Sequence, residues 1–280
     1  MKKFKPTSAG RRDMTGINYR ELLSGDKPMK SLTKGRKNNS GRNSGGRITT
    51  RHRGGGVKRK YRDIDFLLDK KDIPARIETL EYDPNRSGFI ARVVYADGER
   101  RYILAPKSVK VGDTFTVSEK VKPTVGNRLP LKKIPTGTFV YNIELKPNGG
   151  AKIVRSAGNY AEVQAHDGGY VQIKLPSSEI RKIVDTAWAT VGSVSNEEHS
   201  LVRIGTAGRA RRMGRRPVVR GSAMGAHDHP HGGGEGRAGR GHRRQRTKWG
   251  KPAGKGQKTR APKKYSNKLI VSRRKVGKRR

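Results

Sequence analysis

The hydrophobic pattern predicts a first group of four short strands between residues 63 and 126. The run Ala75–Tyr82 alternates, which places Ala75, Ile77, Thr79 and Glu81 on one face. Turn residues separate the runs, above all Asp97-Gly98, a pair typical of tight hairpins. The predicted strands are Ala75–Tyr82, Phe89–Tyr95, Arg100–Leu104 and Thr114–Val117. Four strands joined by hairpins protect their edges best by closing into a small barrel.

A second group of short β-rich runs follows a connection at residues 127–137. In Tyr170–Leu175 the pattern places Val171, Ile173 and Leu175 on the inward face. The predicted strands are Thr138–Leu145, Tyr160–Ala165, Gly169–Leu175, Glu179–Val184 and Trp188–Val194. They indicate a second small barrel. Asn196 followed by Glu197 and Glu198 is typical of a helix N-cap and acidic first turn, so we expect a short helix to close it.

The charge is concentrated at the two ends of the chain. Of 280 residues, 65 are Lys or Arg and 23 are Asp or Glu, a formal net charge of +42. Residues 1–62 carry +16, residues 63–202 carry +2 and residues 203–280 carry +24. A chain this cationic repels itself unless a polyanion neutralises it. We therefore predict two basic arms that bind nucleic acid, on either side of a nearly neutral folded middle.

Glycine follows the same division, with 25 of the 36 glycines in the two arms. Segments rich in glycine and cations bury too little apolar surface to offset chain entropy. We expect the arms to be disordered alone and to become ordered against a partner, since glycine lets a backbone approach phosphates closely. No recognition helix, zinc finger or basic zipper is present to read a DNA groove, which favours RNA.

Composition also disfavours several classes of protein and site. The chain has no cysteine, which removes disulfides, thiolate zinc sites and cysteine nucleophiles. The basic stretches lack an apolar face for membrane binding, and Met1–Pro6 lacks the apolar run of a signal peptide. No phosphate-binding loop motif or arranged catalytic triad occurs. We expect a cytoplasmic protein without enzyme activity, cofactor, metal, membrane contact or homo-oligomer.

Five tyrosines of the predicted strands are candidates for stacking on RNA bases. Small barrels often bind single-stranded or loop RNA through a sheet face and its loops. Strand aromatics are more commonly buried, so both interpretations stay open for Tyr82, Tyr95, Tyr102, Tyr160 and Tyr170.

Long motifs spread along nearly the whole chain resemble one family. They are PTSAGRR (residues 6–12), GRITTRHRGGG (46–56), LEYDPNRS (80–87), DGERRYILAP (97–106), RSAG (155–158) and, most distinctively, DHPHGGGEGR (228–237). Together they resemble the bacterial type of the universal large-subunit ribosomal protein two. The segment Met224–His227 departs from the family, which has Met-Asn-Pro-Val there, and Ala238–Trp249 is more basic than usual.

The resemblance implies a mainly β chain with an OB-fold barrel, then an SH3-like barrel, and tails that extend into the large-subunit rRNA. The expected division is an N-terminal arm (residues 1–62), an OB-fold-like barrel (63–126), an SH3-like barrel (127–202) and a C-terminal extension (203–280). It further implies primary rRNA binding in the ribosome, with support of subunit joining, tRNA binding and peptide-bond formation. The implied partners are large-subunit rRNA, the small subunit, neighbouring ribosomal proteins and tRNA.

The histidine motif admits three interpretations. His227, His229 and His231 alternate beside Asp228 and Glu235, so imidazoles could bind a metal, or His229 could assist peptide-bond chemistry as a general acid or base. Alternate histidines on a glycine-rich loop without thiolates rarely complete a tetrahedral metal site. We therefore favour a loop that packs on RNA, with His229 and His231 as contacts, no metal, and a catalytic role of His229 as the weaker alternative.

Arginines are the predicted contacts to the RNA backbone, because the planar guanidinium can hold phosphate oxygens bidentately. With His52 added, the predicted set is Arg47, Arg51, His52, Arg53, Arg59, Arg86, Arg155, Arg211, Arg212, Arg215, Arg216, Arg220 and Arg237. The leading hypothesis is a structural rRNA-binding protein of the large subunit. The alternatives are an RNA-processing enzyme that uses the histidine loop and a free-standing RNA chaperone.

Overall fold

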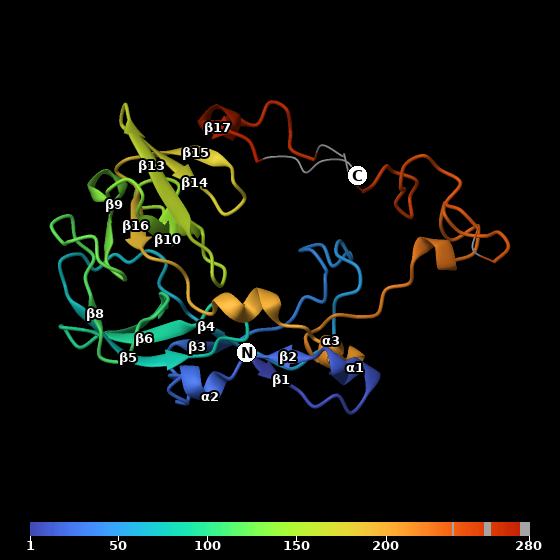
Figure 1. Cartoon of the computed structure of the whole chain (residues 1–280), viewed down its shortest axis with the longest axis horizontal. Coiled ribbons are helices and arrows are strands. Elements are labelled where there is room, and N and C mark those ends of the chain that lie inside the picture. Colours follow the sequence, from blue (N-terminus) through green and yellow to red (C-terminus); the bar gives the residue numbers. More distant parts are fainter. Residues whose placement is uncertain (237, 255–258, 275–280) are drawn as a thin grey trace. The chain divides into compact units, whose positions relative to one another are not determined.

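The computed structural model describes residues 1–236, 238–254 and 259–274, and it divides into two compact units (Figure 1). The first unit comprises Met1–Lys37, Lys58–Arg209 and a third stretch that begins at Lys268. The second comprises Asn38–Val57 and Ala210–Asn267. Among the described residues, no helix has the length and apolar character that crossing a membrane requires.

Four antiparallel strands form the first curled sheet, in the order β7-β6-β5-β8. They are β5 (Ala75–Glu81), β6 (Ile90–Tyr95), β7 (Arg100–Leu104) and β8 (Thr114–Phe115), so the four predicted strands are confirmed. The Asp97-Gly98 turn joins β6 to β7: Tyr95 N–H donates to the Glu99 carbonyl (3.0 Å), and Gly98 has φ of +84°. A positive φ of this kind is what glycine supplies in a tight hairpin.

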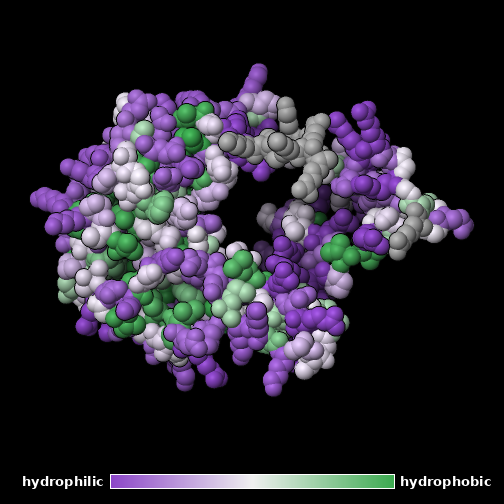
Figure 2. Space-filling model, in the orientation of Figure 1, coloured by the Kyte–Doolittle hydropathy of each residue, from purple (hydrophilic) through white to green (hydrophobic). Residues whose placement is uncertain are grey.

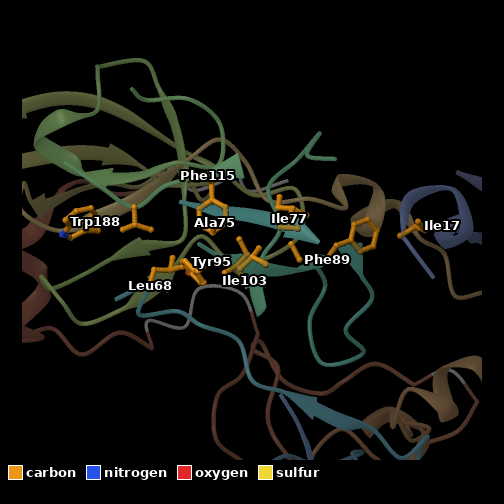
Figure 3. Close-up of a cluster of buried hydrophobic side chains, with 13 residues drawn as sticks. Ile17, Leu68, Ala75, Ile77, Phe89, Tyr95, Ile103, Phe115 and Trp188 are labelled. Carbon is orange, nitrogen blue, oxygen red and sulfur yellow. The ribbon is translucent and has the colours of Figure 1, made fainter. Parts of the chain in front are cut away.

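The alternation predicted for β5 is confirmed by its burial. Ala75, Ile77, Thr79 and Glu81 are buried, and the residues between them are not. Ala75 and Ile77 join Tyr95, Ile103 and Phe115 in the core of the first barrel (Figure 3). Trp188 of the second barrel completes this cluster, so the two barrels share apolar packing within the first unit.

A buried polar network centres on Tyr102 of β7. Its hydroxyl donates to Glu81 Oε2 (2.8 Å) and accepts from the Met29 backbone N–H (2.9 Å). Thr79 Oγ1 donates to the other oxygen of Glu81 (3.1 Å). Burial raises the pKa of Tyr102 to about 12, and the neighbouring Glu81 carboxylate adds to the shift. The network joins the N-terminal arm to the sheet through Met29.

Tyr102→Phe should lower the free energy of unfolding by about 1–3 kcal/mol, because it leaves the Met29 N–H and Glu81 short of a partner. Urea unfolding followed by circular dichroism measures the loss, and faster hydrogen exchange at the Met29 amide would locate it. Tyr82→Phe is the control, since Tyr82 is 45% exposed and should stay within about 0.5 kcal/mol of wild type. Equal stability of the two variants would contradict the assigned role of Tyr102.

The second curled sheet has seven antiparallel strands in the order β17-β15-β14-β13-β10-β16-β9. A separate pair is formed by β11 (Ile143–Glu144) and β12 (Ala151–Ile153). The seven are β9 (Arg128–Pro130), β10 (Phe139–Tyr141), β13 (Ala161–Asp167), β14 (Tyr170–Lys174), β15 (Ile180–Val184), β16 (Trp188–Val191) and β17 (Ile270–Ser272). With the first sheet, they confirm a mainly β fold of an OB-fold barrel followed by an SH3-like barrel.

One local prediction for the second barrel is wrong, and another is confirmed except for one hydrogen bond. Residues 138–145 are not one strand, because Asn142 adopts φ of +54° and separates β10 from β11. The short helix predicted after Asn196 is confirmed as a 3-10 helix, η2 (Glu197–Leu201), with Asn196 at its N-cap position and Glu197 and Glu198 in its first turn. The Asn196 side chain makes no capping hydrogen bond to it. Asn196 lies in the left-handed region, and its side-chain amide donates to the Ser87 carbonyl (2.6 Å). That bond holds Asn196 against the first barrel instead of the helix start.

An ion pair is buried inside the second barrel. Arg128 and Glu144 are 1% and 2% exposed, and Arg128 Nη2 lies 2.9 Å from Glu144 Oε1. Arg128 Nη1 also donates to the Asn142 carbonyl (2.8 Å), while Glu144 Oε2 accepts from the backbone N–H groups of Asn148 (3.1 Å) and Trp188 (3.3 Å). Burial lowers the pKa of Arg128, and Glu144 opposes that shift. These bonds connect β9, β11 and the start of β16 (Trp188–Val191) to the loops that contain Asn142 and Asn148.

The ends of the chain contain short elements that the sequence pattern did not predict. In the first unit β1 pairs with β2, β3 pairs with β4, and β17 adds to the edge of β15. The strands are β1 (Lys2–Lys3), β2 (Thr15–Gly16), β3 (Thr33–Gly35) and β4 (Lys60–Arg62). The helices are α1 (Ala9–Arg12), α2 (Tyr19–Leu22) and α3 (Ala207–Arg212), with the 3-10 turns η3 (Gly221–Ala223) and η4 (Tyr265–Leu269). A further 3-10 turn, η1 (Leu131–Lys133), follows β9 in the middle of the chain. Parts of both basic ends therefore belong to the first unit.

Candidate RNA interface

Two predicted arginines converge on one aromatic ring between the two barrels of the first unit. The Arg155 guanidinium carbon lies 4.5 Å from the centroid of the Phe66 ring, and that of Arg86 lies 5.6 Å away. Arg86 belongs to the turn before β6, and Arg155 follows β12. We call Phe66, Arg86 and Arg155 the junction cluster. Cations over an aromatic face are attracted by the ring quadrupole, so Phe66 holds both guanidinium groups at the same place.

Asp83 fixes one of these arginines and leaves the other accessible. Asp83 is fully buried, and Arg86 Nε donates to its Oδ2 (2.6 Å), with Arg62 Nη1 3.6 Å from Oδ1. Predicted Arg59 donates from Nη1 to the Pro84 carbonyl (2.6 Å) in the same turn. Arg155 is exposed and donates to the Ala151 carbonyl (3.2 Å). The residues that the sequence analysis missed here are Arg62, Phe66 and Asp83.

In the second unit, segments from the two ends of the sequence run side by side. The Gly54 N–H donates to the Gly214 carbonyl (3.1 Å), the Arg216 N–H to His52 (3.1 Å), and the Val57 N–H to Arg212 (3.0 Å). Gly56 has φ of +94°, and a Cβ there would lie 2.8 Å from Arg212 O. Glycine is needed for this close approach, which places Arg53 beside Arg215 in an antiparallel bridge.

Most predicted arginines of the second unit are exposed and have no carboxylate partner among the described residues. The barrels differ, because several of their arginines are paired with carboxylates: Arg92 and Arg100 with Glu78, and Arg101 with Asp65. In the described part of the second unit, the ion pairs are limited to His227 with Asp228 (3.4 Å). The exposed, unpaired set is Arg47, Arg53, Arg212, Arg215, Arg216 and Arg220. Hydrophilic residues cover most of the visible surface (Figure 2).

The other three predicted arginines of the second unit either contact another residue or lie outside the described residues. Arg211 donates to the Gly54 carbonyl at 3.5 Å and is otherwise exposed. The Arg51 guanidinium carbon lies 5.4 Å from the Trp249 ring centroid, a contact that the sequence analysis missed. Arg237 lies outside the described residues.

The histidine loop brings together a set of imidazoles that differs from the alternating set in the sequence. The ring centroids of His229 and His231 are 4.9 Å apart, and His242 lies 6.0 Å from His231. His227 pairs instead with Asp228. The His229 ring lies directly over Gly221, where a Cβ would be 2.4 Å from a ring atom. No sequence spacing indicated His242, which comes from a different loop.

Hydrogen bonds define which nitrogen of each ring accepts. The His231 backbone N–H donates to His229 Nδ1 (3.0 Å), and the Arg246 N–H donates to His231 Nε2 (3.0 Å). An accepting nitrogen carries no proton, which leaves Nε2 of His229 and Nδ1 of His231 as the ring nitrogens that can donate. Burial, then His229, His242 and nearby arginines lower the pKa of His231. Among the described residues no group of three His, Asp or Glu side chains is arranged to hold a metal.

The five candidate tyrosines separate by exposure. Tyr95 and Tyr102 are buried, at 2% and 0%, and cannot stack on a base. Tyr82, Tyr160 and Tyr170 are 45%, 46% and 38% exposed. Tyr82 packs against Tyr19 (ring centroids 5.0 Å apart), and Tyr160 packs against Phe139 (4.5 Å). Tyr95 and Tyr102 are therefore excluded as stacking residues, whereas Tyr82, Tyr160 and Tyr170 keep an accessible ring.

Two family models match the chain. Residues 29–117 match the model described as "Ribosomal Proteins L2, RNA binding N-terminal domain", and residues 124–250 match "Ribosomal Proteins L2, C-terminal domain". Together they cover well over half of the chain, and they contain the strands of both barrels except β17, the junction cluster and the histidine loop.

Proposed function

Because the chain belongs to the ribosomal protein L2 family and is a structural, rRNA-binding component of the large ribosomal subunit, we propose that its second unit and its junction cluster are the principal contacts with rRNA. The observation that carries this proposal is the distribution of ion pairs. Arginines of the barrels are largely matched with carboxylates, whereas those of the second unit have none among the described residues. Unpaired, exposed guanidinium groups bind phosphates without first breaking an internal ion pair.

We propose that all of the predicted arginines contact the RNA backbone. At the junction cluster, Arg86 and Arg155 form a positive site on Phe66, and Arg59 lies in the same turn. Phosphate is the expected ligand, and exposed Arg155 is its main donor, because Arg86 Nε is already bound to buried Asp83. In the second unit we assign phosphate contacts to Arg47, Arg51, Arg53, Arg211, Arg212, Arg215, Arg216, Arg220 and Arg237, with His52 beside them.

We assign the histidine loop to RNA contact and not to general-base catalysis. His229 Nδ1 is occupied by the His231 N–H, so the remaining nitrogen of His229 is a hydrogen-bond donor. A donor suits a phosphate, ribose or base acceptor, whereas a general base needs a free acceptor. Turnover of a peptidyl ester by the isolated protein, lost in His229→Ala, would contradict this assignment.

The finer role rests on the bacterial-type motifs of the sequence. We propose that the protein supports subunit association, tRNA binding and the organisation of the peptidyl-transferase region, in a bacterial cytoplasmic ribosome. Neighbouring ribosomal proteins and the small subunit would be its further partners. An RNA-processing enzyme and a free-standing chaperone are not favoured, since both family matches are to ribosomal protein domains. Sedimentation of a cell extract tests the assignment, because the protein must travel with large subunits.

Arg155→Gln should weaken binding to deproteinised large-subunit rRNA and flatten the slope of log K against log[salt] by about 0.7–0.9, the value for one lost phosphate contact. Filter binding at several salt concentrations measures both. Arg100→Gln is the matched control, because Arg100 already pairs with Glu78 (3.2 Å) on the barrel surface. A slope unchanged in Arg155→Gln, or reduced equally in both variants, would contradict the role of the junction cluster.

A further inference from the structure

A tight hairpin in the second unit presents Trp249 to solvent. The Thr247 N–H donates to the Lys251 carbonyl (2.8 Å), the Gly250 N–H donates to Thr247 (3.0 Å), and Gly250 has φ of +76°. An antiparallel bridge between Arg246 and Pro252 closes the hairpin. Trp249 occupies the tip and is 69% exposed. An aromatic ring this exposed, at the end of a short basic turn, offers a face on which a nucleobase can stack.

Arg51 covers one face of this indole. Its guanidinium carbon lies 5.4 Å from the ring centroid, and it comes from the N-terminal arm, almost 200 residues away in sequence. At 69% exposure the ring is still mostly open. Trp188 shows the contrasting arrangement: Lys71 lies 4.9 Å from its ring centroid, but Trp188 is only 7% exposed and packs in the barrel core.

The surroundings of Trp249 indicate the chemistry of its partner. Lys248 and Lys251 flank the ring in the hairpin, and Arg243, Arg244 and Arg246 precede it. An apolar docking surface for a protein segment would have apolar neighbours, whereas this ring is surrounded by cations. Aromatic rings beside cations are the usual arrangement for stacking on bases of a single strand while the cations hold its phosphates.

We propose that Trp249, with Arg51 on one face, is a stacking site for an unpaired nucleobase of the rRNA. The inference rests on the proposed function, since it assigns a binding mode to the same RNA interface. Lys248 and Lys251 would hold the phosphates next to the stacked base. Stacking tolerates any base, so this site selects an unpaired nucleotide over a duplex without reading its identity.

Binding of the full-length protein to deproteinised large-subunit rRNA tests the proposal. Trp249→Ala should bind about tenfold more weakly, the loss typical of one stacked base, and its salt slope should match wild type because no charge is removed. Trp249→Phe should retain most of the affinity. Trp249→Leu should lose it, because leucine keeps apolar bulk without a π face. Val218→Ala is the control for lost apolar surface, since Val218 is 66% exposed in the same unit.

Tryptophan emission supplies a second measurement, which would not change on adding rRNA if Trp249 had only a structural role. The chain has two tryptophans, so the difference between wild type and Trp249→Phe isolates Trp249. Adding rRNA should quench this difference signal and leave the signal of buried Trp188 nearly unchanged. An unquenched signal, or Trp249→Leu that binds like wild type, overturns stacking while the rRNA-binding function stands. Failure of the wild-type protein to bind rRNA would instead contradict the proposed function.

Discussion

Glu144→Gln should lower the free energy of unfolding by about 3–5 kcal/mol, because it leaves the Arg128 charge buried without its counter-ion. Arg128 is 1% exposed, and its Nη2 lies 2.9 Å from Glu144 Oε1. Glutamine has nearly the shape of glutamate, so the loss reports charge and not packing. Urea unfolding of the full chain, followed by the emission of Trp188 next to the pair, measures it.

The control for Glu144 is a partly exposed carboxylate of the same barrel. Glu162 lies 3.4 Å from Lys174, and its side chain is 35% exposed. Glu162→Gln should change the free energy of unfolding by less than about 1 kcal/mol, since water screens exposed pairs. If both variants lose the same small free energy of unfolding, the Arg128–Glu144 pair does not stabilise the fold as its burial indicates.

A double variant separates the charge from the hydrogen bonds. Arg128→Met combined with Glu144→Gln removes both charges and keeps a side-chain oxygen for the Asn148 and Trp188 N–H groups. Replacing both members of a buried pair is often nearly neutral, so the double variant should be more stable than Glu144→Gln alone. The Asn142 carbonyl loses its donor, which leaves a residual cost of about 1–3 kcal/mol. A double variant less stable than the single one would contradict this account.

The sequence predicted the barrels well because their signal is local. The alternation in β5 and the Asp97-Gly98 turn depend on residues close together in the chain, and both are confirmed. Local patterns do not predict the conformation of a residue when a contact distant in sequence determines it. Asn196 does occupy the N-cap position of η2, yet its side chain bonds to Ser87 in the other barrel and not to the helix. Asn142 reads as mid-strand, but its carbonyl accepts from buried Arg128 while its backbone turns to positive φ.

The sequence predicted which residues belong to the candidate site, but it did not predict which residues they contact. Charge and motifs indicated Arg86 and Arg155, but nothing in the sequence showed that both lie over Phe66. The same holds for the pairing of Arg51 with Trp249 and of His231 with His242, because each joins segments whose separation has no fixed period. The strand β17 is a further example: residues 270–272 carry no alternation of their own and become a strand at the edge of β15.

Replacing five arginines of the second unit with glutamine should give the largest change in rRNA binding. Each lost phosphate contact flattens the salt slope by about 0.7–0.9, so five should flatten it by about four. Between 50 and 200 mM salt, the affinity of the variant should then fall about 10²-fold less than that of wild type. The five are Arg211, Arg212, Arg215, Arg216 and Arg220, all exposed.

A second quintuple variant with the same change in net charge decides whether contacts or total charge set that slope. Five cations on the surface of the barrels already pair with carboxylates and should contribute little to rRNA binding: Arg100, Lys107, Lys132, Lys174 and the half-buried Lys182. Changing them to glutamine should alter the slope by less than one. If both quintuple variants flatten the slope equally, long-range attraction by net charge would account for binding. A loss confined to the second unit would instead mean that the unpaired guanidinium groups make the phosphate contacts.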